Sequence, residues 1–290
     1  GVLEYVNPFI GTGGHGHTYP GASLPFGMVQ LSPDTRLEGW DGCSGYHYTD
    51  SVIFGFSHTH LSGTGIADYA DVLLMPSGGK IKFDNGYQKP RFSGYSSLFA
   101  KETEKAEAGW YSVNLQDYNI DVELTATLRA GFHKYTFNQP DSAHIILDLM
   151  HRDQVIESYI KIVSDTEIEG FRRSKEWAQD QYVYFVAQFS EPIASFILKN
   201  GDKESSDVKE ISGTKLKAAF SFNLKEKNEV LVKVGISAVD AAGARNNLNT
   251  EIVDWDFNKT KEAAQNTWKE SLSRFEVEGG TDDQKTIFYT

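Results

Sequence analysis

Two histidine pairs with the spacing His-x-His lie in the first 80 residues: His15 with His17, and His58 with His60. Imidazole is a common metal ligand, and an H-x-H pair on a strand points to one side. The four rings could therefore converge on a metal ion in a metal-dependent hydrolase. Glycines around the first pair disfavour a regular strand, and no cysteine or acidic cluster adjoins it. Buried histidines that bond to backbone groups are commoner, so both interpretations stay open.

Residues 38–48, Glu-Gly-Trp-Asp-Gly-Cys-Ser-Gly-Tyr-His-Tyr, form a second group of polar and aromatic side chains. Trp40 stands in a glycine-rich loop, where a large apolar ring needs a partner. It can be a stacking platform for a sugar ring, flanked by polar groups such as Asp41, or a plug that closes one end of the fold. The sequence favours these two interpretations equally.

These loops do not contain a complete set of catalytic residues. Asp68 and Asp71 could act as general acid or base, but carboxylates in glycine-rich turns usually bind their own backbone. The chain has no G-x-S-x-G elbow. Its one cysteine, Cys43, lacks an activating neighbourhood and cannot form an internal disulfide. We therefore assign no catalytic residue and no metal ligand to these 290 residues.

The composition excludes several classes of partner. A formal charge of -12 argues against nucleic acid and anionic membranes, because both are polyanions, and a neutral substrate is unaffected. No apolar run approaches the roughly 18 residues of a membrane span. Hydrophobic residues make up 40% of the chain and aromatic residues 13%, a surplus that suits a pleated sheet and also suits sugar binding.

Alternation of apolar and polar residues predicts a long series of strands. More than ten strands with few helices indicate a large antiparallel β-sandwich. Residues 172–181 are expected to connect two strands, with Trp177 as a core or edge ring among solvated basic residues, Arg172, Arg173 and Lys175. Beyond residue 95 the predicted strands are residues 110–115, 120–128, 132–137, 143–149, 159–169, 181–189, 194–198, 216–223 and 229–237.

The last 50 residues change from strand to helix patterns. Residues 258–275 carry apolar side chains at helical spacing, and residues 240–249 are a second helix candidate. Thr281 and Gln284 form a capping box that opens another helix, so we expect a helical region to follow. The predicted organisation is a β-sandwich over residues 1–238, with site-lining loops in residues 1–80. One or two linker helices follow in residues 239–290.

Several motifs resemble glycoside hydrolase family 92, the calcium-dependent exo-α-mannosidases. The opening Tyr5-Val-Asn-Pro-Phe-Ile-Gly-Thr-Gly-Gly-His-Gly-His-Thr-Tyr-Pro-Gly-Ala is similar to the N-terminal signature of that family. Further motifs are similar in order and spacing, and the likeness covers essentially the whole chain. They are Phe26-Gly-Met-Val-Gln-Leu-Ser-Pro-Asp-Thr, Gly45-Tyr-His-Tyr, Gly55-Phe-Ser-His-Thr-His-Leu-Ser-Gly-Thr-Gly and Asp71-Val-Leu-Leu-Met-Pro.

The resemblance implies the N-terminal domain of an inverting exo-α-mannosidase that acts on α-mannose-containing glycans. It also implies a partner, an (α/α)6 barrel of the same protein, which carries the catalytic acid, the base and most calcium ligands. The site would lie between the two domains, and the protein would be secreted, periplasmic or on the surface of a bacterium. By motif, the mannose-binding residues on this chain would be Gly13, Gly14, His15, Trp40 and Asp41, followed by His58 and His60, which could instead be a structural pair.

Two other classes of function stay open from the sequence. A free-standing carbohydrate-binding module would recognise glycans without cleaving them. A metal-dependent hydrolase would be built on the four histidines named above. Tight sugar binding by these residues alone would favour the first, and stoichiometric zinc in the purified protein would favour the second.

Overall fold

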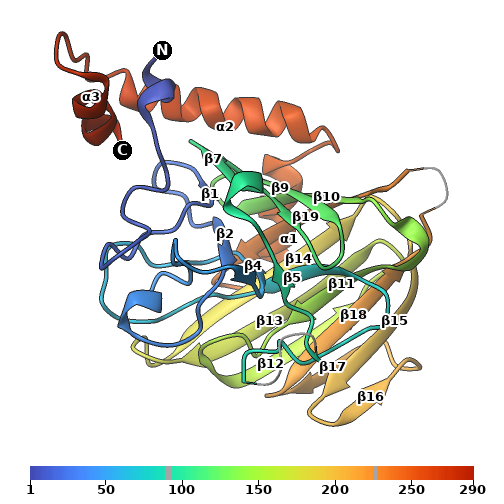
Figure 1. The fold of residues 1–290 in the computed structure, drawn as a ribbon. Coiled ribbons are helices and arrows are strands. Elements are labelled where there is room, and N and C mark those ends of the chain that lie inside the picture. The colour runs from blue at the N-terminus through green and yellow to red at the C-terminus, as the bar shows by residue number, and fades with distance from the viewer. Residues whose placement is uncertain (89–92, 225–226) are drawn as a thin grey trace.

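Two large antiparallel sheets enclose one hydrophobic core in the computed structural model, which describes residues 1–88, 93–224 and 227–290 (Figure 1). The predicted mainly β, antiparallel architecture is thereby confirmed. Within the described residues, the first sheet has the order β1 (Ala22–Ser23), β2 (Gln30–Asp34), β4 (Gly55–Ser57), β5 (Leu73–Gly78), β11 (Ala143–Asp148), β18 (Leu216–Phe222), β15 (Ile193–Asn200) and β16 (Lys203–Ser205).

The second sheet is wider and is also antiparallel throughout. Its order is β17 (Glu210–Gly213), β12 (Gln154–Ile162), β13 (Glu167–Lys175), β14 (Gln181–Phe189), β19 (Glu229–Ser237), β10 (Ala130–Phe137), β9 (Ile120–Ala126), β8 (Trp110–Leu115) and β7 (Lys105–Glu107). The short strands β3 (Val52–Ile53) and β6 (Ser97–Leu98) pair with each other. Short 3-10 helices occur at η1 (Val2–Tyr5), η2 (Trp40–Gly42), η4 (Lys101–Thr103) and η5 (Pro140–Ser142).

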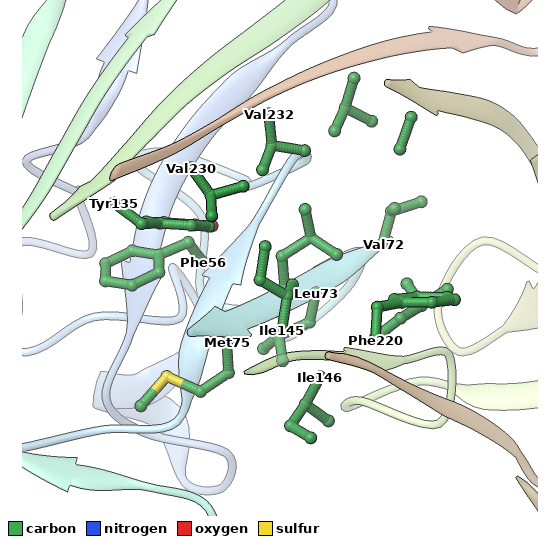
Figure 2. Packing of buried hydrophobic residues seen from close by; sticks show 14 of the residues in the cluster. Phe56, Val72, Leu73, Met75, Tyr135, Ile145, Ile146, Phe220, Val230 and Val232 are labelled. Carbon is green, nitrogen blue, oxygen red and sulfur yellow. The ribbon is translucent and has the colours of Figure 1, made fainter. Parts of the chain in front are cut away.

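Period-two patterning explains how these strands build the core. In β9, Ile120, Val122 and Leu124 are buried, whereas Asp121 faces solvent. Side chains from both sheets interdigitate in the interior, including Phe56, Met75, Tyr135, Ile145, Phe220 and Val232 (Figure 2). This core is the rigid base from which the long loops of the first 80 residues project.

One predicted strand, residues 159–169, is wrong. β12 ends at Ile162 and β13 begins at Glu167, and a turn joins them. In this turn the backbone N–H groups of Val163 and Ser164 both donate to the carbonyl of Glu167, over 2.9 and 3.1 Å. The turn contains neither glycine nor proline. The polar run Ser164-Asp165-Thr166 was the local turn signal that separates the two strands.

The described C-terminal residues form helices at the three predicted places: α1 (Ala241–Glu251), α2 (Phe257–Leu272) and α3 (Asp282–Tyr289). Asp240 and Asp256 cap the first two by accepting backbone N–H groups. The predicted capping box of α3 is confirmed, with Thr281 and Gln284 bonded reciprocally. None of the helices within the described residues combines the length and apolarity needed to cross a bilayer.

α1 and α2 cover one side of the wider sheet, and α3 lies beside η1, which brings the chain ends together (Figure 1). A second apolar cluster joins α1 and the start of α2 to that sheet. Where the two ends of the chain meet, the Asn7 N–H donates to Thr290 Oγ1 over 2.9 Å, and the Tyr5 ring stacks on Tyr289. The second cluster consists of Trp110, Ala130, Phe132, Val186, Leu231, Ala244, Leu248, Ile252 and Phe257.

Candidate functional site

Three loops, residues 11–18, 39–46 and 62–65, meet on one surface, and we call them the loop cluster. They belong to the blue segments in Figure 1. Ser44 Oγ donates to the Thr18 carbonyl over 3.0 Å, which joins the first two loops. Gly63 N–H donates to the His17 carbonyl over 2.8 Å, and Cys43 Sγ lies 2.7 Å from the Thr64 carbonyl. The loops therefore hold one another by polar contacts between segments distant in sequence.

Trp40, Asp41 and His15 come together on this surface. The Trp40 indole is 58% exposed, although its residue opens the short helix η2. His15 Nδ1 lies 2.6 Å from Asp41 Oδ1, and the His15 ring centroid lies 5.2 Å from the Trp40 ring centroid. Hydrogen bonds from His15, and secondarily from His17, hold the pKa of Asp41 below its usual range. The plug interpretation of Trp40 does not agree with this exposure.

Glycines fix the shape of the first loop. A Cβ on Gly16 would lie 2.0 Å from the Gly11 carbonyl oxygen, so no other residue fits there. Gly14 has a φ of +57° and is exposed, and its carbonyl lies 3.2 Å from His47 Nε2. Gly13 is half-buried beside Tyr48. These two glycines set the backbone path that presents His15.

His60 lies in the interior beneath the loop cluster, next to buried charged side chains. Its side chain is fully buried, with Nδ1 2.7 Å from the Gln30 carbonyl and Nε2 3.0 Å from Asp34 Oδ1. The Tyr19 ring packs against it. Despite burial, the imidazoles of His60 and His151 hold the pKa of Asp34 well below its usual range. Both His60 nitrogens have protein partners, which supports a structural role.

His58 is also fully buried and belongs to a chain of neutral groups. Its Nδ1 lies 2.6 Å from the Val72 carbonyl and must carry the proton. Its Nε2 therefore accepts from His133 Nε2, at 2.9 Å, and His133 Nδ1 accepts from the Tyr135 hydroxyl, at 2.8 Å. Burial lowers the pKa of His58 to about 4, which agrees with a neutral ring.

The four histidines of the two H-x-H pairs do not converge. His15 and His17 contact Asp41, whereas His58 and His60 have the separate partners described above. Within residues 1–88, 93–224 and 227–290, no group of three or more His, Cys, Asp or Glu side chains could hold a metal ion. This geometry gives no support to a histidine-based metal hydrolase.

The prediction that Arg172 is solvated is wrong. It lies on β13 and is completely buried, with Nη1 paired to Asp71 Oδ1. Asp71 is thereby engaged, and it also accepts from Gln181 Nε2 over 2.6 Å. Arg173, one residue on, is partly exposed and pairs with Asp180. Trp177 is 68% exposed at the β13–β14 turn and is not a core ring.

Sequence reasoning missed part of the loop cluster. His17 was considered only as a metal ligand, yet its ring is buried against Asp41 and Trp40. Gly65 was not singled out, although a Cβ there would lie 2.5 Å from Trp40 Nε1. The glycine-rich motif Ser62-Gly-Thr-Gly was the available signal, because such a run allows close approach of other groups.

Comparison with known families decides where this arrangement belongs. The model of the glycosyl hydrolase family 92 N-terminal domain matches residues 5–237, and that of the family 92 catalytic domain matches residues 243–290. The chain belongs to glycosyl hydrolase family 92. A relative in the fungus Arthroderma benhamiae, described as an uncharacterized secreted glycosidase, is 27% identical over 99% of this chain and 40% of its own length.

Solved family 92 structures share the fold of this family member. An α-mannosidase of Bacteroides thetaiotaomicron, solved in complex with mannoimidazole, is 35% identical with a TM-score of 0.95. The match covers 99% of this chain and 39% of that one. An inverting mannosidase of the same organism is 27% identical with a TM-score of 0.86, over 99% of this chain and 38% of that one. The chain thus spans about two fifths of the length of these relatives.

Proposed function

We propose that these 290 residues are the N-terminal part of a calcium-dependent, inverting exo-α-mannosidase that removes terminal mannose from glycans. Membership of family 92 and the mannosidase relatives support this substrate class. The role of this part is to contribute loops to the mannose pocket. As the fungal relative is described as secreted, we propose that the protein is exported, to the periplasm, the cell surface or the medium.

The observation that carries this proposal is the exposed indole of Trp40, which lies beside the Asp41 carboxylate. Only one oxygen of this carboxylate has hydrogen-bond partners within the described residues. Both histidine contacts of Asp41 fall on Oδ1, and no hydrogen bond within the described residues uses Oδ2. An exposed indole can stack on the apolar face of a pyranose, while Asp41 Oδ2 and His15 Nε2 bond its hydroxyls. Gly13 and Gly14 would bring exposed backbone close to the same sugar. His58 and His60 would support the pocket from below.

The catalytic acid and base belong, in this proposal, to an (α/α)6 barrel reached through residues 239–290. Inversion requires two carboxyl groups roughly 6.5–9.5 Å apart with a water between them. Two of the buried carboxylates, Asp34 and Asp71, are already engaged in ion pairs. No group of three or more His, Cys, Asp or Glu side chains within the described residues could hold a metal ion, which supports our proposal that the calcium ligands lie mainly on the barrel.

Phe26 supports the existence of an interface on this chain. Its side chain is fully exposed, and its φ of +61° places a bulky residue in the left-handed region. Leu128, 44% exposed, lies at the same edge, where its carbonyl accepts from the Met28 N–H over 2.7 Å. A strained and exposed aromatic ring is expected where a partner covers it. The barrel of the same protein is the partner that we propose.

The test measures mannose release from a panel of α-linked mannobioses by the 290-residue chain, with calcium present and then chelated. We expect no turnover in either condition. Calcium-dependent turnover would show that acid, base and metal ligands all lie within these residues, against the proposal.

Binding of methyl α-mannoside to the same chain, followed by NMR, tests the pocket itself. We expect weak, millimolar binding that Trp40→Ala and Asp41→Asn abolish. Trp177→Ala is the matched control, because it removes another exposed indole at a different place. Micromolar binding would instead indicate a free-standing carbohydrate-binding module. Equal effects of Trp40→Ala and Trp177→Ala would refute the assigned surface.

A further inference from the structure

We propose that His17 is the positioning residue of the loop cluster and that it holds Asp41 as an imidazolium cation. Its protonation state follows from its hydrogen-bond partners and from the ionised state of Asp41. Its consequence for sugar binding rests on the proposed function. The experiments below separate the two.

The first proton of the His17 ring is fixed by the third loop. Nδ1 lies 2.6 Å from the Thr64 carbonyl oxygen, and a carbonyl can only accept. Nδ1 therefore carries hydrogen in every state that keeps this contact. The ring is buried, with 5% of its side chain exposed, so water cannot substitute for this partner.

The second ring proton of His17 is required by its contact with Asp41 in the second loop. His17 Nε2 lies 3.3 Å from Asp41 Oδ1, and an ionised carboxylate also only accepts. A neutral ring with its proton on Nδ1 would turn a lone pair towards that oxygen. Asp41 stays ionised, because the hydrogen bond from His15 lowers its pKa. The contact is therefore attractive only when His17 carries both protons.

His15 differs from His17 in the number of ring protons that its contacts require. Its side chain is 71% exposed, and its Nδ1 lies 2.6 Å from the same Asp41 oxygen. One proton on Nδ1 is enough for this bond, and no hydrogen bond within the described residues uses Nε2. His15 can be neutral, with Nε2 open to a ligand, while the buried His17 supplies the charge.

The other groups around His17 leave Asp41 as its counter-ion. The Trp40 ring packs perpendicular to it, with the centroids 4.4 Å apart. Cys43 Sγ shares the Thr64 carbonyl, and burial raises the pKa of this thiol, so it stays neutral. Arg152 lies behind this loop and donates to the Gly42 carbonyl. Through these contacts one ring orients both the carboxylate and the indole of the proposed sugar surface.

Replacing the His17 imidazolium removes this charged hydrogen bond, so Asp41 and Trp40 lose the ring that orients them. Loss of the bond should weaken mannose binding about tenfold.

The decisive measurement is the nitrogen spectrum of 15N-histidine-labelled protein, with the His17 signals assigned through His17→Gln. Because both ring nitrogens face acceptors, we expect two protonated nitrogens on His17. Asp41→Asn should convert the ring to the neutral form with hydrogen on Nδ1 only. A neutral His17 in the unmutated chain, while Asp41 is ionised, would overturn the proposal even if mannose binds.

Titration with methyl α-mannoside tests the functional consequence. We expect His17→Gln to lower affinity about tenfold, because a neutral amide does not replace the charged hydrogen bond. His15→Asn, the matched control, keeps a donor beside Asp41 and should leave His17 doubly protonated in the nitrogen spectrum. An unchanged affinity in His17→Gln would refute the positioning role. If no variant and no unmutated chain binds mannose, the proposed function fails while the nitrogen spectrum still decides the charge of His17.

Discussion

Replacing Arg172 with methionine tests how the loops that carry the site are fixed to the sandwich. The buried guanidinium donates from Nε to the Leu149 carbonyl over 3.0 Å. Nη2 donates to the carbonyls of His151 and Asp153, over 2.8 and 3.1 Å. Nη1 pairs with Asp71. One side chain thus joins β13, the β11–β12 connection and the segment that precedes β5.

Methionine fills similar volume but leaves the Asp71 carboxylate buried without its counter-ion. Removing one partner of a buried ion pair costs about 3–5 kcal/mol. That is a large part of the roughly 5–15 kcal/mol by which a domain is stable. With a denaturant slope of about 3 kcal/mol/M, the midpoint of urea unfolding should fall by about 1–2 M.

The neighbouring substitution Arg173→Met is the matched control. Arg173 forms its ion pair with Asp180 at the surface, where solvent screens the interaction. The urea midpoint of this variant should stay close to that of the unmutated chain. Adding Asp71→Asn to Arg172→Met should recover part of the loss, because the buried charge disappears. Equal midpoints for Arg172→Met and Arg173→Met would refute the reasoning.

Three further predictions concern pH, the indole and the exposed phenyl ring. The pKa of His58 is lowered by burial from 6.5 to about 4, so its neutral form is the folded one. The free energy of unfolding should have its full value above pH 6.5 and should fall by about 3 kcal/mol as the pH drops towards 4. Urea unfolding at several pH values measures this loss. A His58 ring that titrates near 6.5 by NMR would contradict this. Gly65→Ala places a methyl group 2.5 Å from Trp40 Nε1, so it should weaken mannose binding several-fold. Its thermal unfolding should stay unchanged, because the exposed indole can move aside. Phe26→Asn should stabilise the 290-residue chain by about 1 kcal/mol, because asparagine tolerates positive φ. A lower melting temperature would show that the ring already packs within this chain.

The sequence by itself determined the features that depend on near neighbours. Period-two patterning located β8, β14 and β19, since a half-buried strand needs only alternate apolar side chains. The capping box at Thr281 and Gln284 was likewise readable, because both partners lie within one helical turn. The motifs around His15 and Trp40 also identified the family and the loops that meet on one surface.

The tertiary structure alone decided which charged and aromatic groups are buried. Arg172 and Asp71 are 101 positions apart, and His133 and His58 are 75 apart, so no local pattern predicts that they pair. The same applies to His17, whose role depends on a carbonyl 47 positions away. A buried charge is tolerated only where a partner neutralises it, and the partner is known only when the chain has folded. Sequence therefore identified the residue types of the site, while packing assigned each of them to the surface or to the supporting interior.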